Sequence, residues 1–355
     1  MTIKNIIETF DIWKEKENPV VLATVYETSG STYSKAGQRI IINSEGDYQG
    51  LVSGGCLEGD IAERSNSVIK ENKTEVITYD MRDDADDIFG LGVGCNGLLR
   101  IILQSLTPEK NYEPLNTINK VLYQESRGHD GLVKLLTIIN SSKKGFFPGD
   151  NLILDKNSEI LYSSFSEHSK EKYLIEHEEF LLEEKSILKN SNSNEISVLC
   201  TPLVPIPKLL ILGAGLDSLP IIDMASILGW RTTVVDHRPA YFEKNNFSNA
   251  EEILLLSSPK ELSKKCKLGL FDAVVVMSHH LESDRIYLDQ LKDIQLSYLG
   301  VLGPSDRKNR LIESIDKGKD NLKNKLKGPV GLSIGANSPE TIALSLLAEI
   351  YTKIN

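Results

Sequence analysis

The chain has 355 residues, of which 40% are hydrophobic, and a formal net charge of −10. This length predicts two domains with separate cores. The negative charge argues against nucleic-acid or anionic-membrane partners, because those surfaces need clustered lysine and arginine. Four widely spaced cysteines indicate a reducing cytoplasm rather than a disulfide framework. No stretch approaches the roughly 20 apolar residues of a membrane span, and the amphipathic N-terminal segment is not a signal peptide.

The first half is predicted to alternate short strands with glycine-rich loops. Runs rich in β-branched residues predict strands at 19–26, 39–43, 74–79 and 98–103. A helix is expected to begin near Leu57, after the loop SGGC. Residues 108–190 mix helical and extended signals and contain no chemical motif. We therefore expect an N-terminal mixed α+β domain over residues 1–200, which ends at the proline-rich stretch TPLVPIPK.

From Lys208 the pattern changes to strands that alternate with helices, as in a parallel sheet. The expected strands are LLILG, TTVVD, AVVVM and YLGVLG, with helices at about 217–228, 281–293 and 306–317. In a last helix, Ser338 can cap, Pro339 suits the first turn and Glu340 favours the positive end of the dipole. Residues 206–355 are therefore predicted to form a Rossmann-like domain with a doubly wound parallel sheet, and the fold class is α/β.

The motif GAGLDS directly follows the first of these strands. Gly213 suits the tight turn of a dinucleotide fingerprint and Gly215 the close approach of a pyrophosphate, although Ser218 holds the third glycine position. Asp217 places a carboxylate where it competes with phosphate for amide donors. Asp236 ends the next strand, 23 residues after Gly213, where a ribose-binding acid belongs. The motif indicates a site for NAD(P) or another nucleotide, and the alternative is a Rossmann domain kept as a scaffold.

The segment MSHHLESD follows the AVVVM strand. It should lie at the carboxyl edge of the sheet, where open α/β folds bind ligands. His279 could there bind a metal or phosphate, or transfer a proton. The alternative is a helix start at which Ser278 caps and the histidines are solvated.

Two cysteines are flanked by glycines, Cys56 in SGGCLE and Cys95 in GLGVGCNG. Gly54 and Gly55 would expose the first thiol and turn backbone amides toward an anion, and a helix that begins after it would stabilise its thiolate. The alternative is that the glycines only make tight turns. Two thiols without a histidine nearby in sequence do not indicate a structural zinc site. The acidic run at 80–87 lacks the spacing of a calcium loop, and we interpret it as solvated.

Taken together, these motifs resemble the xanthine dehydrogenase accessory factors of the XdhC/CoxI family. In the first half the matching stretches are GSTYSKAGQRIII, VSGGCLEGDIAER and GLGVGCNG. In the second half they are LLILGAGLDSLPIIDMASILGWRTTVVDHRP, VVVMSHHLESD, YLGVLGPSDRKNRL and GLSIGANSPETIALSLLAEI. The resemblance covers both ends of the chain and leaves about 108–195 without a motif.

The resemblance implies an accessory protein rather than the dehydrogenase itself. Such a protein binds molybdenum cofactor (molybdopterin), protects it during sulfuration and delivers it to an apo-hydroxylase. The implied partners are a molybdenum hydroxylase of the xanthine dehydrogenase type, a sulfur-donating cysteine desulfurase and a second copy of the chain in a homodimer. Thiolates suit a soft metal or its sulfur, and cationic side chains suit a phosphate. The implied cofactor-binding residues are Cys56 and Cys95 at the molybdenum, Lys35 and Arg39 at the phosphate, the glycine loop of Gly54 and Gly55, and Gly213, Gly215, Asp236 and His279.

Two other classes remain open. One is an NAD(P)-dependent oxidoreductase that uses the C-terminal domain, and the other is a regulatory protein that only binds partners. A dehydrogenase needs a proton-transfer group beside its substrate. His279 is the only strong candidate, so we expect weak or absent turnover of nicotinamide substrates. If both halves act on one ligand, Cys56, Cys95 and His279 should line a single inter-domain cleft, within one chain or between two copies of it.

Overall fold

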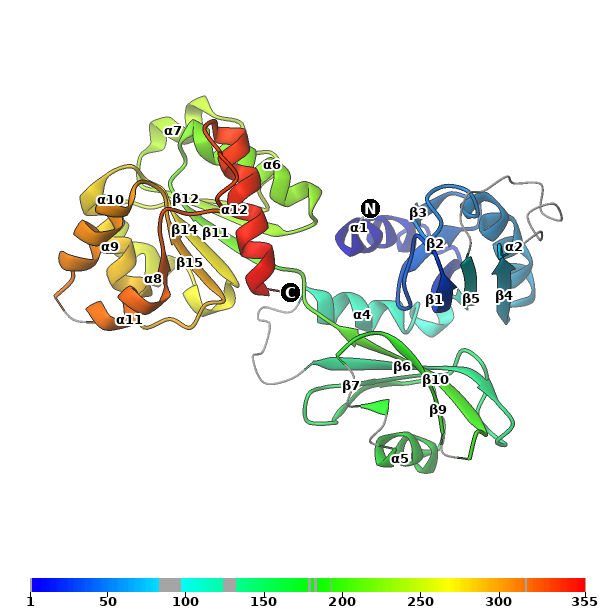
Figure 1. Ribbon diagram of the computed structural model, residues 1–355. Coiled ribbons are helices and arrows are strands. Elements are labelled where there is room, and N and C mark those ends of the chain that lie inside the picture. The colour runs from blue at the N-terminus through cyan, green and yellow to red at the C-terminus, as the bar shows by residue number, and fades with distance from the viewer. Residues whose placement is uncertain are drawn as a thin grey trace. The chain divides into compact units, whose positions relative to one another are not determined.

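The computed structural model describes residues 2–82, 97–123, 132–177, 180–181, 184–191, 193–316 and 318–354 (Figure 1). Its contacts divide the chain into two compact units, Met1–Gln124 with Gly128–Pro205, and Glu125–Arg127 with Ile206–Asn355. Among the described residues, no helix combines the length and the apolar character needed to span a membrane. Each unit is described by itself below.

The first unit contains, within its described residues, two antiparallel sheets of five strands. The first sheet has the order β3-β2-β1-β5-β4. Apolar side chains on one of its faces pack on helix α2 through Leu57, Ile61 and Val68, because alternate strand residues share a face. The strands are β1 Val20–Gly30, β2 Arg39–Asn43, β3 Tyr48–Gly50, β4 Thr74–Asp80 and β5 Gly97–Leu106, and the helices are α1 Ile3–Lys14 and α2 Glu58–Glu71. The strands predicted in this part are confirmed, as is the start of a helix next to Leu57.

The second sheet lies mostly in the stretch that carried no motif. The run ISVLC predicts a strand and forms part of this sheet, but sequence analysis missed the other strands. Its order is β8-β7-β6-β10-β9. Tyr26 and Ile102 of the first sheet pack on Ile139 and Leu199 of the second. Its strands are β6 Val133–Ser141, β7 Asn151–Leu154, β8 Ile160–Ser163, β9 Ile187–Asn190 and β10 Ile196–Leu203, and its helical segments are η2 Pro108–Lys110, α4 Leu115–Leu122 and α5 His168–Glu176. Strand β10 therefore includes the first residues of TPLVPIPK.

The second unit has a parallel sheet with the order β13-β12-β11-β14-β15-β16. The four predicted strands are present, and β13 and β16 add to them. The strands are β11 Lys208–Leu212, β12 Arg231–Asp236, β13 Glu252–Leu255, β14 Ala273–Val276, β15 Tyr298–Val301 and β16 Leu326–Lys327. The chain runs from β11 outward to β13 and then returns to β14 on the other side of β11. The carboxyl ends of β11 and β14 therefore flank the reversal point, where open α/β sheets usually bind ligands.

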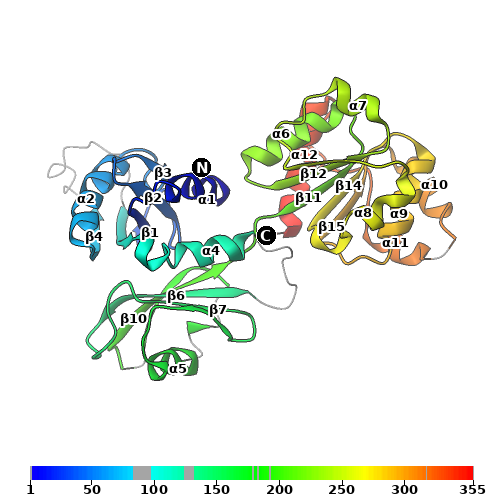
Figure 2. The same cartoon turned by 180° about the vertical axis from the view of Figure 1, so that it is seen from behind.

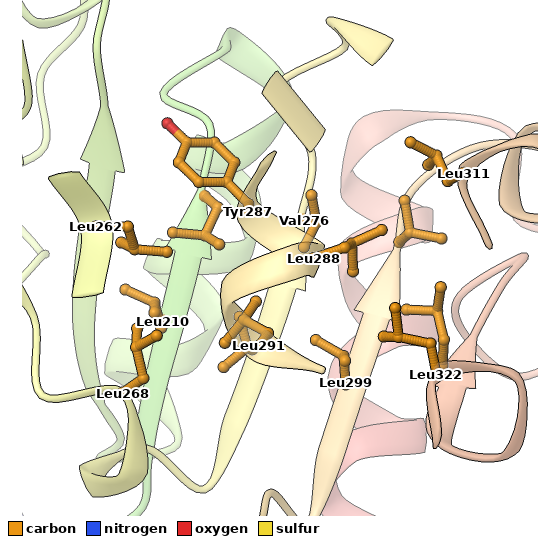
Figure 3. Packing of buried hydrophobic residues seen from close by; sticks show 14 of the residues in the cluster. Leu210, Leu262, Leu268, Val276, Tyr287, Leu288, Leu291, Leu299, Leu311 and Leu322 are labelled. Carbon is orange, nitrogen blue, oxygen red and sulfur yellow. The ribbon is translucent and has the colours of Figure 1, made fainter. Parts of the chain in front are cut away.

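Helices cover both faces of this sheet, which confirms the predicted Rossmann-like α/β architecture (Figures 1 and 2). One face packs on α6 and α12. The other packs on α8 to α11, and Figure 3 shows Tyr287, Leu288 and Leu291 of α9 over the sheet. The helical segments are η4 Leu216–Ser218, α6 Leu219–Ile227, α7 Pro239–Lys244, η5 Pro259–Glu261, α8 Leu262–Lys265, η6 Leu268–Leu270, α9 Leu281–Leu291, α10 Ser305–Glu313, α11 Lys319–Lys325 and α12 Pro339–Ile354.

Candidate functional site

Cys56 lies in the loop between β3 and α2, directly before the helix. Its thiol is free and the residue is exposed, as expected from the sequence. Gly54 and Gly55 have φ angles of +82° and +110°, in the region that side chains disfavour. The backbone of this loop therefore needs glycine at both positions, and the result is an exposed thiol next to the N-terminus of a 14-residue helix.

Glu58, which the sequence analysis did not single out, holds this loop together. Its fully buried carboxylate accepts hydrogen bonds from the amides of Val52 (2.8 Å), Ser53 (2.8 Å) and Gly55 (3.0 Å), and from the Ser53 hydroxyl at 2.5 Å. Burial by itself would raise the pKa of the Glu58 carboxyl, but the hydrogen bonds from Ser53 and Val52 outweigh it and keep this pKa below its usual range. The sequence signal for this role was a glutamate in the first turn of a helix, preceded by a serine in the loop.

The bonds to Glu58 correct one expectation. The loop was predicted to turn its amides toward an external anion, but the amides of Val52, Ser53 and Gly55 donate to Glu58 instead. Ser53 also accepts a bond from the Leu57 amide at 2.7 Å. The chain's own carboxylate thus occupies this nest, and the exposed group that remains for chemistry is the thiol.

A small pocket adjoins Cys56, and it brings two of the predicted motifs together. Thr32 and Tyr33 of the GSTYSKAGQR loop line it together with Cys56 and Met81. Tyr33 is exposed and lies beside Gly54, where an added Cβ would meet its ring at 3.6 Å. The pocket thus combines a thiol, a thioether and an aromatic ring. Cys95, the other predicted thiol, lies outside the described residues.

The two predicted phosphate partners differ in their surroundings. Lys35 is exposed on the loop. Arg39 is buried on β2, and its Nε and Nη2 atoms have no hydrogen-bond partner among the described residues. Burial lowers the pKa of the Arg39 guanidinium to about 10. Its neighbours Ile40 and Ile42 face α2, and because side chains of a strand alternate, Arg39 faces the opposite side of the sheet.

In the second unit, the glycine loop after β11 makes the predicted tight turn, but a side chain of the protein itself covers the loop. Gly213 has a φ angle of +135°, and a Cβ there would lie 2.4 Å from the Met277 carbonyl oxygen. This glycine therefore allows the ends of β11 and β14 to approach each other. A Cβ on Gly215 would lie 2.5 Å from Oδ1 of Asp217. The close approach that a pyrophosphate would need is thus taken by the chain's own carboxylate.

Asp236 was predicted to bind a ribose, but its carboxylate is fully buried and satisfied within the chain. It accepts hydrogen bonds from the amides of Ala214 (2.8 Å), His237 (2.7 Å) and Arg238 (3.0 Å). The Arg238 side chain adds bonds at 2.9 and 2.7 Å. Burial would raise the pKa of the Asp236 carboxyl, but the bonds from Arg238 and Ala214 lower it. In this arrangement Asp236 shapes the glycine loop and does not present an acceptor to a ligand.

His279 lies across the reversal point and forms an ion pair with Asp217, with 2.7 Å between Nε2 and Oδ2. The hydrogen bond that the His279 imidazole donates to the Asp217 carboxylate raises the pKa of this imidazole. The residue has a φ angle of +58°, and its side chain is 58% exposed. Capping of this helix by Ser278 was the alternative interpretation of the sequence, but His280 is the cap and Ser278 instead bonds to Asp284. No group of three or more potential metal ligands is present among the described residues.

Comparisons with known proteins match both units of the chain. Residues 209–350 match the XdhC Rossmann domain, and residues 13–80 match the XdhC and CoxI family. A protein of Bacillus subtilis that is described as a probable subunit of xanthine dehydrogenase is 30% identical over 98% of this chain and 96% of its own length. The "Molybdenum cofactor insertion chaperone PaoD" of Escherichia coli is 20% identical over 93% of this chain and 82% of its own.

A solved structure, described as a xanthine dehydrogenase from Bacillus halodurans, has the same fold. It matches with a TM-score of 0.75 and 28% identity, over 99% of this chain and 96% of that one. Together with the relative from Bacillus subtilis, which is similar over almost the whole length of both chains, these matches confirm the resemblance found in the sequence. The chain belongs to the XdhC and CoxI family.

Proposed function

We propose that the protein is an accessory factor that binds molybdenum cofactor through its first unit and delivers it, with sulfuration, to a molybdenum hydroxylase. Two similarities support the accessory role, the cofactor insertion chaperone of Escherichia coli and the probable dehydrogenase component of Bacillus subtilis. The client in this proposal is an enzyme of the xanthine dehydrogenase type, and a cysteine desulfurase donates the sulfur. The protein acts in the cytoplasm as a homodimer.

The exposed thiol of Cys56 is the observation that carries this proposal. Molybdenum in this cofactor is held by dithiolene sulfurs, and soft thiolates suit such a metal or its sulfur. Cys56 lies directly before the N-terminus of α2. Glu58 holds the loop in one conformation, so the thiol is presented by a rigid element. Cys95 is proposed as the second sulfur contact.

The phosphate of the cofactor is proposed to pair with the GSTYSKAGQR loop. Lys35 is exposed on this loop, and Thr32 and Tyr33 of the same loop line the pocket beside Cys56. A lysine ammonium forms charge-assisted hydrogen bonds with phosphate oxygens. Arg39 adds a buried positive charge that has no carboxylate partner among the described residues. The same loop thus supplies the pocket wall and the exposed Lys35, while Arg39 lies on the opposite face of the sheet.

The geometry disfavours the alternative, an NAD(P)-dependent oxidoreductase. A dinucleotide needs an open glycine loop for its pyrophosphate and a free acid for its ribose. Asp217 covers Gly215, and Asp236 is bonded to Arg238 and to backbone amides. His279, the proposed proton-transfer group, is paired with Asp217. Each of the groups that a dehydrogenase would use therefore already has a partner in the chain.

The test uses the full chain purified under anoxic conditions from cells that make the cofactor. Molybdenum content and native mass report cofactor retention in the wild type and in the Cys56→Ala, Cys95→Ala and double variants. We expect the double variant to lose most of its cofactor while its thermal unfolding temperature is unchanged. Cys266→Ala is the matched control, because it removes a buried thiol in the second unit. Undiminished retention in the double variant would overturn the proposal.

A further inference from the structure

A cavity of about 650 Å³ opens in the second unit, beside the carboxyl ends of β15 and β16. Two loops form its walls, 302–304 after β15 and 329–336 after β16, and Ile342 and Ser345 of α12 close one side. This volume lies within the range of roughly 300 to 1,000 Å³ that is usual for small-ligand pockets. The cavity belongs to the motif GLSIGANSPE, to which the proposed function assigns no role.

The wall of this cavity is held in place by partly buried polar contacts. Glu349 of α12 accepts bonds from the Gly331 amide at 2.7 Å and from the Tyr298 hydroxyl at 2.6 Å. The hydroxyl of Ser345 donates to the Leu332 carbonyl oxygen at 2.7 Å. A Cβ on Gly331 would lie 2.1 Å from that hydroxyl, so only glycine fits there. The start of the loop, at Gly331 and Leu332, is therefore held in place before any ligand arrives.

The same loop presents unpaired hydrogen-bond donors. The amides of Ser333, Gly335 and Ala336 donate to no acceptor among the described residues, whereas those of Leu332 and Ile334 are paired. Unpaired amide donors favour an anionic oxygen group. Helix α12 begins at Pro339, just beyond this loop, and the positive end of its dipole also interacts with Glu340 in the first turn.

The remaining lining of the cavity is apolar. Leu302, Val330 and Ile342 contribute aliphatic side chains, and no acidic or basic side chain of the described residues lines the cavity. Aliphatic walls suit a flat ring, because they exclude water without requiring polar partners. The cavity thus combines a surface for a ring with a set of donors for one anionic group.

The cavity lies beside the ends of β15 and β16, away from the glycine loop after β11. The usual pyrophosphate position is covered by Asp217, which is paired with His279, and Asp236 is occupied by Arg238. The end of β15, next to β14, carries the cavity instead. We propose that the second unit binds a nucleoside monophosphate in this cavity, with its phosphate on the 333–336 amides and its base against Val330 and Ile342. This inference is independent of the proposed cofactor role.

The test measures binding of AMP, GMP, CMP and UMP to the full chain by isothermal titration calorimetry. We expect at least one to bind with a Kd well below about 1 mM, a binding free energy beyond about −4.1 kcal/mol. Ile342→Trp, which places an indole in the cavity, should weaken that binding at least tenfold. Leu344→Trp is the matched control, because Leu344 is exposed on the same helix and lines a different groove. Adenosine and its counterparts without phosphate should bind more weakly.

Three results would overturn the proposal. One is that none of the four nucleotides binds at about 1 mM. Another is binding that Ile342→Trp leaves unchanged. The third is binding that appears only in Asp217→Ala, because the ligand would then use the glycine loop after β11 rather than this cavity. Loss of cofactor retention in the cysteine variants has no bearing on any of these readouts.

Discussion

The two units each contain a glycine loop that precedes a helix, and the comparison shows how differently such loops can be used. In each loop a buried carboxylate binds the backbone amides, Glu58 in the first unit and Asp236 in the second. The second loop carries an additional, outer carboxylate, Asp217, over Gly215. The first loop leaves a thiol exposed at the corresponding place. A glycine-rich turn before a helix therefore predicts a backbone conformation more securely than it predicts a bound anion.

Removing the inner carboxylate of the first loop should have the largest effect. Glu58→Ala leaves three buried or partly buried amides without an acceptor, and each such group costs about 1 to 3 kcal/mol. We expect the free energy of unfolding of the first unit to fall by about 3 to 5 kcal/mol, measured by urea denaturation. Glu63→Ala, an exposed position on the same helix, is the control and should change stability little.

The pH dependence of stability checks the same carboxylate. The folded pKa of Glu58 is lowered, so its contribution is present above the unfolded value of about 4.3 and is lost as the pH falls through the folded pKa. Wild type and Glu58→Ala should therefore converge in stability under acid conditions. A Glu58→Ala variant as stable as the wild type at neutral pH would show that the loop does not depend on this residue.

The inner carboxylate of the second loop should have an intermediate effect. Asp236→Asn keeps the size of the side chain but removes the charge that pairs with Arg238. The NH₂ group of the asparagine would also face N–H groups that now donate to the carboxylate, so it would find no acceptor there. We expect a loss of about 2 kcal/mol in the unfolding free energy of the second unit. The control is Asp223→Asn on α6, whose partner Asn249 is exposed. An equal effect of both substitutions would mean that Asp236 has no special role in the loop.

The comparison also separates what the sequence predicted from what it missed. The parallel sheet of the second unit was predictable because its strands are continuous apolar runs, such as AVVVM, bounded by helices. Most of the second sheet of the first unit was missed because β7, β8 and β9 have only four residues each, which is too short for a clear alternating pattern. In the site, Cys56 and its glycine turns were predicted from local pattern. Glu58 and the pairing of Asp217 with His279 were missed, because side chains that satisfy a loop from within leave little periodic signal.

Asp217, the outer carboxylate of the second loop, should have the smallest effect on stability. It should have the largest effect on how accessible the Gly215 amide is to an anion. Asp217→Ala removes an exposed ion pair, and such pairs contribute at most about 1 kcal/mol. The pKa of His279 is raised by Asp217, so the pair's contribution is full below the unfolded value of about 6.5 and is lost as the pH rises through the folded pKa. NMR titration should show the His279 pKa falling in Asp217→Ala, while the unfolding free energy stays unchanged at a pH above the folded His279 pKa. Because Gly215 is then uncovered, inorganic phosphate should perturb the Gly215 amide resonance in the variant more than in the wild type. If phosphate perturbs the Gly215 resonance equally in both proteins, Asp217 does not close this loop. The two loops would then not differ in the way proposed, with a covered loop in the second unit and an exposed thiol in the first.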